Sequence, residues 1–504
     1  MKLEKSLKQY FNFSAFRQGQ KEIISSVLEG NHTIAMLPTG TGKSLCYQLP
    51  GYMLEGQVVI ISPLLSLMQD QAEQLMINGE KRVVAFNSFL SRDEKHEALL
   101  QLNKYKFIFL SPEMLRFDYV IRRLQQLNIS LLVIDEAHCI SQWGYDFRPD
   151  YLKLGATRKK LGNPVTLALT ATATKEVKED IISTLALDVW KEFIYSVDRA
   201  NIAMTVEKIE TQSEKNERLI ELVSSLEGPG IVYFNSKKMC EQAVAMLKDR
   251  GIEDVMAYHA GMNQENRILI QQQFIHRQLR VICATSAFGM GINKEDVRYI
   301  IHYHMPLQIE SYLQEIGRAG RDGGRSIAIL LYSAGDEQLA YQLAEGEIPT
   351  DDQIDWVFHW LKENPHAVHQ LQSIENELRR MANLTETQWR LIADLLQFDK
   401  EPDLQETAER FKSYMNERMQ IKRKKITEIY NWIHANSCRR KMILQYFAED
   451  KKMEIEGCCD RCGIEMTNFY SKTIKKEEVA KPIIDWRKQL AEILLSKWAD
   501  MDEG

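Results

Sequence analysis

The sequence contains no long hydrophobic run. None of its apolar segments approaches the roughly 20 residues of a bilayer-spanning helix, and its start, MKLEKSLKQYF, lacks the hydrophobic stretch of a signal peptide. Of its 504 residues, 44% are hydrophobic and 27% are charged, as in soluble globular proteins. These features exclude a helical membrane protein. We expect a cytoplasmic enzyme with two or more domains.

The sequence also lacks an excess of positive charge. It has 64 Lys and Arg residues against 70 Asp and Glu residues, so the formal net charge is −6. A uniformly basic nucleic-acid-binding surface is therefore excluded, and any site for a polyanion must be local. The most basic short stretch is QIKRKK, residues 420–425.

Cysteines are few and unevenly placed. Four single cysteines lie among apolar residues and are expected to be small buried side chains: Cys46, Cys139, Cys240 and Cys283. The other four predict a structural zinc site, because zinc prefers thiolates and such sites have four ligands: Cys438, Cys458, Cys459 and Cys462. Adjacent cysteines seldom both bind one metal, so His434 is an alternative to Cys458. A redox pair or simple buried thiols also stay open.

Short Val- and Ile-rich runs recur between about residues 20 and 335, with helical stretches between them. They are VVIIS, FIFLS, LLVIDEA and VTLALT, then IVYF, RVICAT, YIIHY and SIAILLY. This pattern predicts an α/β fold with two parallel sheets, joined near residues 197–218, where polar residues accumulate. After about residue 340 the pattern becomes helical. There Thr385 and Gln388 have the spacing of a capping box.

The stretch LPTGTGKS, residues 37–44, predicts a phosphate-binding loop after a strand. Leu37 stands where the strict pattern has glycine, and the other required residues are present. Backbone N–H groups, the lysine and the serine of such a loop hold phosphate and magnesium. The expected contacts are Thr39, Gly40, Thr41, Gly42, Lys43 and Ser44. The alternative is an ordinary glycine turn before a helix.

The stretch LLVIDEAH, residues 131–138, ends a buried run with two carboxylates. The carboxyl edge of a parallel sheet is its usual ligand-binding edge. We therefore expect Asp135 to hold magnesium together with Ser44, and Glu136 to activate the attacking water as a general base. Taken alone, such a pair more often belongs to a solvated loop.

The stretch QEIGRAGRDGG, residues 314–324, places two arginines among glycines. The permanently charged guanidinium groups of Arg318 and Arg321 suit a phosphate whose negative charge rises during transfer. Alone, this stretch would be read as a basic surface turn.

Taken together and in order, these stretches resemble a known family. FRQGQ, LPTGTGKS, DEAH, TAT, VICATSAFGMGINKEDVR and QEIGRAGRDGG resemble a superfamily 2 helicase with two RecA-like domains. FNFSAFRQGQKEII, DEAHCISQWGYDFRPDY, and SCRRKMILQYF followed by GCCDRC are similar to the RecQ family of DNA helicases. The resemblance covers residues 10–335 almost continuously, and 437–463. It implies an ATP-dependent 3′-to-5′ DNA helicase of repair or recombination that uses Mg²⁺ and Zn²⁺.

The resemblance also assigns roles to single residues. It implies an adenine-reading segment at Phe13, Arg17 and Gln20. It implies residues that face the nucleotide or couple it to the strand at Gly289, Asp296 and Gln314. Contact with DNA is expected at Ser141, Gln142, Trp143, Tyr145, Phe147, Arg148 and Thr170. The aromatic loop at 141–151 offers faces for base stacking, although such a loop could equally be packed core.

The expected domains are residues 1–205 and 206–340, each RecA-like, followed by a helical lead-in (341–437), a zinc module (438–465) and a short helical tail (466–504). The family's winged-helix and HRDC domains do not fit after Cys462. The lead-in with QIKRKK is therefore either a substitute DNA contact or a packing insert. Expected partners are single-stranded and forked DNA, with single-strand-binding and repair proteins. Rival functions are an RNA helicase, a strand-remodelling or annealing ATPase, and a nucleotide-binding scaffold.

Overall fold

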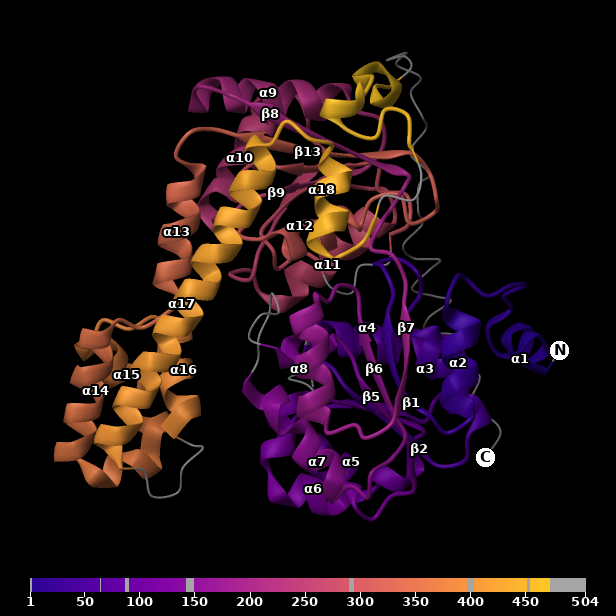
Figure 1. Cartoon of the computed structure of the whole chain (residues 1–504), viewed down its shortest axis with the longest axis vertical. Coiled ribbons are helices and arrows are strands. Elements are labelled where there is room, and N and C mark those ends of the chain that lie inside the picture. Colours follow the sequence, from indigo (N-terminus) through magenta and orange to yellow (C-terminus); the bar gives the residue numbers. More distant parts are fainter. Residues whose placement is uncertain are drawn as a thin grey trace, which may run out of the picture. The chain divides into compact units, whose positions relative to one another are not determined.

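The computed structural model describes residues 2–63, 65–86, 90–141, 149–289, 294–396, 403–450 and 454–471 (Figure 1). Within these ranges the chain forms two parallel β-sheets with helices around them, and helices alone follow the second sheet. This arrangement confirms the predicted fold class. No helix within the same ranges has the length and apolar character needed to cross a membrane.

The first sheet has seven parallel strands: β1 (His32–Met36), β2 (Gln57–Ile61), β3 (Val83–Phe86), β4 (Phe107–Leu110), β5 (Ile129–Ile134), β6 (Thr166–Thr170) and β7 (Trp190–Ile194). Their order across the sheet is β3-β4-β2-β5-β6-β1-β7. The four predicted runs of this half form β2, β4, β5 and β6, whose apolar residues are buried on both faces. The surrounding helices are α1 (Lys2–Phe11), α2 (Gln20–Leu28), α3 (Leu45–Met53), α4 (Leu65–Ile77), α5 (Arg92–Leu100), α6 (Asp118–Leu124), α7 (Leu154–Lys160) and α8 (Lys175–Leu185).

The second sheet has six parallel strands: β8 (Ile202–Lys208), β9 (Gly230–Tyr233), β10 (Val255–Tyr258), β11 (Val281–Ala284), β12 (Tyr299–His302) and β13 (Ser326–Tyr332). Their order is β10-β11-β9-β12-β13-β8. Its helices are α9 (Gln212–Ser225), α10 (Lys237–Asp249), α11 (Gln264–Ile275) and α12 (Ile309–Ile316). The predicted runs form β9, β11, β12 and β13.

Strand β8 lies in the polar stretch where the sequence pattern lapses. It pairs with β13 along its whole length, from Ile202 opposite Ser326 to Lys208 opposite Tyr332. Its first residues are buried, whereas Glu207 and Lys208 reach solvent, so the strand looks polar in sequence. The predicted domain boundary between residues 205 and 206 therefore falls inside β8, and the second sheet begins at Ile202.

The region after β13 is helical, as predicted: α13 (Asp336–Gly346), α14 (Asp351–Glu363), α15 (Leu371–Met381), α16 (Glu386–Leu396), α17 (Leu404–His434) and α18 (Arg439–Tyr446). The capping box at the start of α16 is confirmed. Gln388 N donates to Thr385 Oγ1 at 3.2 Å, and Thr385 N donates to Gln388 Oε1 at 2.9 Å.

Helix α17 connects two apolar cores. It has 31 residues, which corresponds to about 46 Å. Near its start, Ala408, Phe411 and Met415 pack in a core with α14–α16. Near its end, Ile429 and Trp432 join the core that reaches the second sheet. The helix thus ties a separate helical bundle, formed by α14–α16 and the first half of α17, to the rest of the chain.

The basic stretch in α17 pairs with acids of this chain. Lys422 forms an ion pair with Glu347, and Arg423 Nη2 lies 3.0 Å from Glu345 Oε1. Lys425 is buried and pairs with the carboxylate of Glu310 in α12. These three side chains hold α17 against α13 and α12. Three of the four basic side chains of QIKRKK therefore have acidic partners within the chain, and both interpretations of the stretch stay open.

Candidate nucleotide site and cysteine cluster

One cavity of about 630 Å³ is lined by loops of both sheets. The predicted site residues on its walls are Phe13, Arg17, Gln20, Thr39, Gly40, Gly42, Lys43, Ser44, Asp135, Glu136, Gly289, Gln314, Arg318 and Arg321. Its volume is in the range of small-molecule binding sites. Sequence stretches from both halves of the chain therefore meet at one place.

The loop between β1 and α3 has the backbone that a phosphate cradle needs. Gly40 and Gly42 have φ values of 86° and 77°, a left-handed conformation that favours glycine. Leu37, where the strict pattern has glycine, is buried in the core of the first sheet. Lys43 Nζ is buried and, among the described residues, has no hydrogen-bond partner. A buried cation on a cavity wall fits an anionic ligand such as phosphate.

Asp135 and Glu136 follow β5 at the edge of the sheet. Asp135 N donates to the carbonyl of Ile61 at 2.8 Å, which fixes the start of the turn. Glu136 has a φ of 47°, a conformation that costs energy in a non-glycine residue and is common at functional sites. Its Oε1 lies 3.7 Å from Lys43 Nζ. Both carboxylates therefore face the cavity beside the cradle.

The two carboxylates have opposite pKa shifts. Burial and the neighbouring charge of Glu136 raise the pKa of Asp135 to about 7. Burial also acts on Glu136, but its interactions with Lys43, His138 and Arg318 outweigh burial and lower its pKa. Paired acids with separated pKa values can take different roles in catalysis. The carboxylate of Asp135 and the hydroxyl of Ser44 are oxygen ligands of the kind that Mg²⁺ binds.

His138 connects Glu136 to the TAT segment. Its Nδ1 lies 3.4 Å from Glu136 Oε2 and 3.0 Å from Thr170 Oγ1, and the Thr170 hydroxyl donates to the carbonyl of Thr172 at 3.0 Å. Thr170 is 1% exposed, so its hydroxyl is engaged inside the protein in this structure, and its contact with DNA stays a prediction. His138 was not among the predicted site residues. The DEAH stretch, of which it is the last residue, was the available signal.

Arg318 and Arg321 reach the cavity from the loop that follows α12. A Cβ at Gly289 would lie 2.3 Å from Arg318 Nη2, so the glycine leaves room for this guanidinium group. Burial, Arg318 and Arg199 lower the pKa of Arg321 to about 10, which leaves it charged at neutral pH. With Lys43, these arginines place three cations around one cavity. That charge suits a polyphosphate.

The segment predicted to read adenine lies on the cavity wall. Phe13 is 54% exposed and so presents a ring face for stacking. Arg17 Nη1 donates to a backbone carbonyl of the phosphate loop at 2.7 Å. Gln20 Nε2 donates to the carbonyls of Thr41 and Gly42 at 2.9 and 3.1 Å. Gln20 therefore supports the phosphate loop here, and its hydrogen bonds to adenine stay a prediction.

Asp296 is not on the cavity wall. It pairs with Lys294 at 2.9 Å and with Arg277 at 2.8 Å, which holds it outside the cavity. The neighbouring Glu295 lines the cavity instead, 3.4 Å from Arg17 Nη2. Adjacent side chains point in different directions, and the sequence does not reveal which of two adjacent acids faces the ligand.

Most of the predicted DNA contacts lie outside the described residues: Gln142, Trp143, Tyr145, Phe147 and Arg148. Ser141 precedes them and is 1% exposed, with its hydroxyl donating to Asp180 Oδ2 at 2.5 Å. Its polar group is therefore engaged inside the protein in this structure, and its contact with DNA stays a prediction. The aromatic loop remains a prediction.

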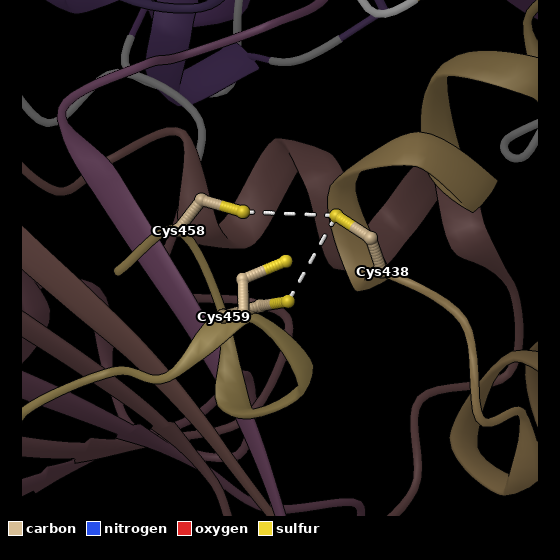
Figure 2. Close-up of side chains that lie close together, drawn as sticks. Cys438, Cys458 and Cys459 are labelled. Atoms are coloured by element: carbon tan, nitrogen blue, oxygen red, sulfur yellow. Dashed lines mark hydrogen bonds between the residues drawn. The ribbon is translucent and has the colours of Figure 1, made fainter. Parts of the chain in front are cut away.

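The four clustered cysteines meet at one point. Figure 2 shows the thiol of Cys438, just before α18, facing those of Cys458 and Cys459. The sulfur atoms of all four, Cys462 included, lie within 4.8 Å of one another. Tetrahedral zinc with Zn–S bonds of about 2.3 Å separates its sulfurs by about 3.8 Å, so the set fits this metal. His434 instead stacks on Tyr430, with ring centroids 4.1 Å apart.

The cysteine loop is fixed to the second sheet and to α18. Met204 N in β8 donates to the carbonyl of Cys458 at 3.1 Å. The buried guanidinium of Arg439 forms two hydrogen bonds of 3.0 Å with the carboxylate of Asp460. We call the segment from Cys438 to Tyr470 the cysteine module. Its loop and its helix are held together independently of the thiols.

Comparison with known proteins agrees with these features. Three family descriptions match: DEAD/DEAH box helicase at residues 17–180, helicase conserved C-terminal domain at 214–323, and RecQ zinc-binding at 401–463. A Bacillus subtilis protein named probable ATP-dependent DNA helicase RecS is 45% identical over 500 residues, 98% of each chain. The chain belongs to the RecQ family.

Another RecQ-family relative, the ATP-dependent DNA helicase RecQ of Haemophilus influenzae, is 40% identical over 66% of this chain and 53% of its own length. Among solved structures, Mycobacterium smegmatis helicase Lhr bound to ssDNA and AMP-PNP has a TM-score of 0.55 at 19% identity, covering 77% of this chain and 57% of its own. S. cerevisiae Dbp5 bound to RNA and ADP BeF3 has a TM-score of 0.54 at 18% identity, covering 68% and 89%. At these identities the two structures support the fold alone.

Proposed function

We propose that this chain is an ATP-dependent DNA helicase that moves 3′ to 5′ along single-stranded DNA and separates duplexes. The observation that carries the proposal is the shared cavity, where Lys43 and Glu136 from the first sheet face Arg318 and Arg321 from the second. Family membership supports DNA as the substrate. The family's association with DNA repair and recombination extends the proposal to those processes.

In the proposed reaction the phosphate loop and Lys43 hold the β- and γ-phosphates of ATP. Glu136 takes a proton from the attacking water, since its lowered pKa keeps it ionised at neutral pH. Arg318 and Arg321 stabilise the charge that grows on the transferred phosphoryl group. Bound Mg²⁺, for which Ser44 and Asp135 are the proposed ligands, would neutralise phosphate charge.

Movement follows because the cavity walls belong to both sheets. ATP contacts the two sets of charged groups at once, so binding favours a closed cleft and hydrolysis removes that preference. The network from Glu136 through His138 to Thr170 connects the γ-phosphate region with the TAT segment. The aromatic loop, residues 141–151, is our candidate for the element that engages the DNA strand.

We assign the helical lead-in a structural role. Its bundle, residues 348–419, contains eight basic and fourteen acidic residues, a net charge of −6. Such a surface repels a polyanion. Three of the four basic side chains at residues 422–425 of α17 pair with Glu347, Glu345 and Glu310. We infer that DNA does not bind along this bundle.

We propose Zn²⁺ as the metal of the cysteine module, with Cys438, Cys458, Cys459 and Cys462 as its ligands. Bound zinc would crosslink the start of α18 to the loop at 458–462, a structural role. The thiol geometry supports Cys458 over His434 as the fourth ligand.

The proposal is tested by Mg²⁺-dependent ATP hydrolysis without nucleic acid, with single-stranded DNA and with single-stranded RNA. The Glu136→Gln protein is the blank, because it keeps the size of the side chain and removes the base. We expect strong stimulation by DNA and little by RNA. Equal or greater stimulation by RNA would replace the proposal with the RNA helicase alternative, and no hydrolysis at all would replace it with the scaffold.

A further inference from the structure

The segment between β7 and β8 lies against both nucleotide-binding loops. In this linker, residues 195–201, the side chain of Arg199 points at the phosphate loop and at the loop that carries the two site arginines. We call residues 317–324 the arginine loop. Neither the composition of the linker nor any motif marks Arg199 as a functional residue.

Every N–H group of the Arg199 guanidinium has an acceptor. Nη1 donates to the carbonyl of Thr39 in the phosphate loop at 2.9 Å and to that of Gly317 at 3.2 Å. Nη2 donates to the carbonyls of Ala319 and Gly320 at 3.0 and 2.6 Å. Nε donates to Asn201 Oδ1 at 3.4 Å. One side chain therefore bridges the two loops.

The contact between the two loops is tight. A Cβ at Gly317 would lie 2.0 Å from Thr39 Oγ1, so the backbone at Gly317 approaches the Thr39 side chain as closely as glycine permits. Asn201 adds two hydrogen bonds from its Nδ2, to the carbonyls of Gly320 and Gly324 at 2.8 and 2.9 Å. The linker thus fixes the backbone on either side of Arg321, although it provides no wall of the cavity.

The cysteine module holds the same linker from its other side. Arg440, next to Arg439 in α18, is 2% exposed and donates to the carbonyl of Arg199 at 3.0 Å and to that of Ile202 at 2.5 Å. It also pairs with Asp198. Glu449, just after α18, accepts from Val197 N at 3.1 Å.

This arrangement forms a continuous path of contacts. The cysteine loop is hydrogen-bonded to Arg439 through Asp460. The next residue, Arg440, donates to the linker backbone, and Arg199 in the linker donates to carbonyls of both nucleotide-binding loops. Each step is a set of hydrogen bonds between groups that are buried or partly buried. Fixed donors of this kind set the position of the catalytic groups they hold.

We propose that Arg199 is a positioning residue for ATP hydrolysis, which aligns the phosphate loop with the arginine loop, and that the cysteine module holds Arg199 in place through Arg440 and Glu449. The inference deepens the proposed function and rests on it. It assigns the cysteine module a second role, at the nucleotide cleft, in addition to any role in the stability of its own fold.

Arginine suits position 199 because of the number and arrangement of its donors. Arginine has five N–H donors in a planar fork, whereas lysine concentrates three donors on one atom. A lysine at position 199 keeps the positive charge, but its single nitrogen cannot make the five hydrogen bonds that Nη1, Nη2 and Nε of Arg199 form. Arg199→Lys therefore removes most of the hydrogen bonds between the loops while it keeps a positive charge near the phosphates.

The experiment compares wild type, Arg199→Lys, Arg440→Met and Glu449→Gln. Arg250→Met is the control, since Arg250 is exposed and pairs with Glu217 in the neighbouring helix α9. For each full-length protein we would measure zinc content, DNA-stimulated kcat and KM for ATP, and affinity for a non-hydrolysable ATP analogue. Small-angle X-ray scattering with and without the analogue reports closure of the cleft independently of turnover.

We expect Arg199→Lys to lower kcat at least about tenfold while analogue affinity changes less than about threefold, because ground-state contacts of ATP with Lys43 remain. Nucleotide-induced compaction should shrink in parallel. Arg440→Met should also lower kcat and compaction, with full zinc content. Glu449→Gln should lower both less, because glutamine keeps an oxygen that can accept from Val197 N. Arg250→Met should match wild type.

Wild-type kcat and compaction in Arg199→Lys would overturn the proposal. Wild-type values in both Arg440→Met and Glu449→Gln would overturn the part assigned to the cysteine module. Failure of the proposed function looks different, since wild type itself would then show no DNA-stimulated hydrolysis. In that case the scattering measurement still decides whether Arg199 controls closure of the cleft.

Discussion

Replacing Asp135 with Asn is expected to stabilise the nucleotide-free protein and to abolish hydrolysis. In the folded chain, burial and the charge of Glu136 raise the pKa of Asp135 from 3.8 to about 7. A shift of about 3 units corresponds to about 4 kcal/mol at 1.36 kcal/mol per unit, and the partial solvent exposure of Asp135 reduces this to about 2 kcal/mol. In the proposed function this unfavourable charge is retained because the carboxylate binds Mg²⁺.

The pH dependence has a defined sign. Since the pKa is higher in the folded than in the unfolded chain, the folded protein loses stability as the pH rises from about 4 to about 7. Asn at position 135 resembles the protonated acid and escapes this loss. The gain of the variant over wild type should therefore be complete at pH 8 and less than half as large at pH 5.

The assay is thermal unfolding of Asp135→Asn and wild type at pH 8 and pH 5, with the exposed Asp249→Asn as control. A gain of about 2 kcal/mol should raise the Tm of the first transition by several degrees at pH 8. Addition of Mg²⁺ and ADP should then stabilise wild type more than the variant, because ligand binding adds to stability and the variant lacks the carboxylate. A variant that is no more stable than wild type at pH 8, or equally stabilised at both pH values, would show that the Asp135 charge does not destabilise the folded chain.

Three other substitutions give separate tests. Cys459→Ser should lose bound zinc, measured by atomic absorption, and expose the chain after residue 434 to protease; a metal-free but protected protein would contradict a structural site. Phe13→Ala should raise KM for ATP about tenfold with little change in kcat, because stacking on a base contributes about 1–3 kcal/mol. Arg116→Met leaves the carboxylates of Asp150 and Asp394, which Arg116 now bridges, without their cation. It should lower the free energy of urea unfolding by about 2 kcal/mol, and an unchanged midpoint would show that the bridge contributes nothing.

The nucleotide site was largely predictable because each of its stretches carries its chemistry locally. The left-handed backbone of the phosphate loop requires glycine at positions 40 and 42, and its phosphate contact requires the lysine at position 43. These requirements are met within a few adjacent residues, so the sequence alone reveals them. The capping box of Thr385 and Gln388 was predictable for the same reason, since its hydrogen bonds span one helical turn. The number and close spacing of the four clustered cysteines indicated a common metal site.

What the sequence could not reveal depends on contacts between distant segments. Ser141 and Thr170 look like polar surface residues, and only the packing of α8 and of His138 shows that their hydroxyls are buried. The basic stretch in α17 reads as a solvated or DNA-binding run until its acidic partners in α12 and α13 are known. Arg199 is a single arginine in a polar linker, and its importance arises entirely from where the two loops meet.

In the proposed function, ATP hydrolysis in the shared cavity separates DNA strands. Its most direct test is strand displacement on three duplexes of equal length, one with a 3′ single-stranded tail, one with a 5′ tail and one with blunt ends, with Glu136→Gln as control. We predict that wild type, with ATP and Mg²⁺, unwinds the 3′-tailed duplex, leaves the other two largely intact, and that the variant unwinds none. Displacement from the 5′-tailed duplex alone would reverse the proposed direction, and DNA-stimulated hydrolysis with no displacement from any duplex would exclude a helicase.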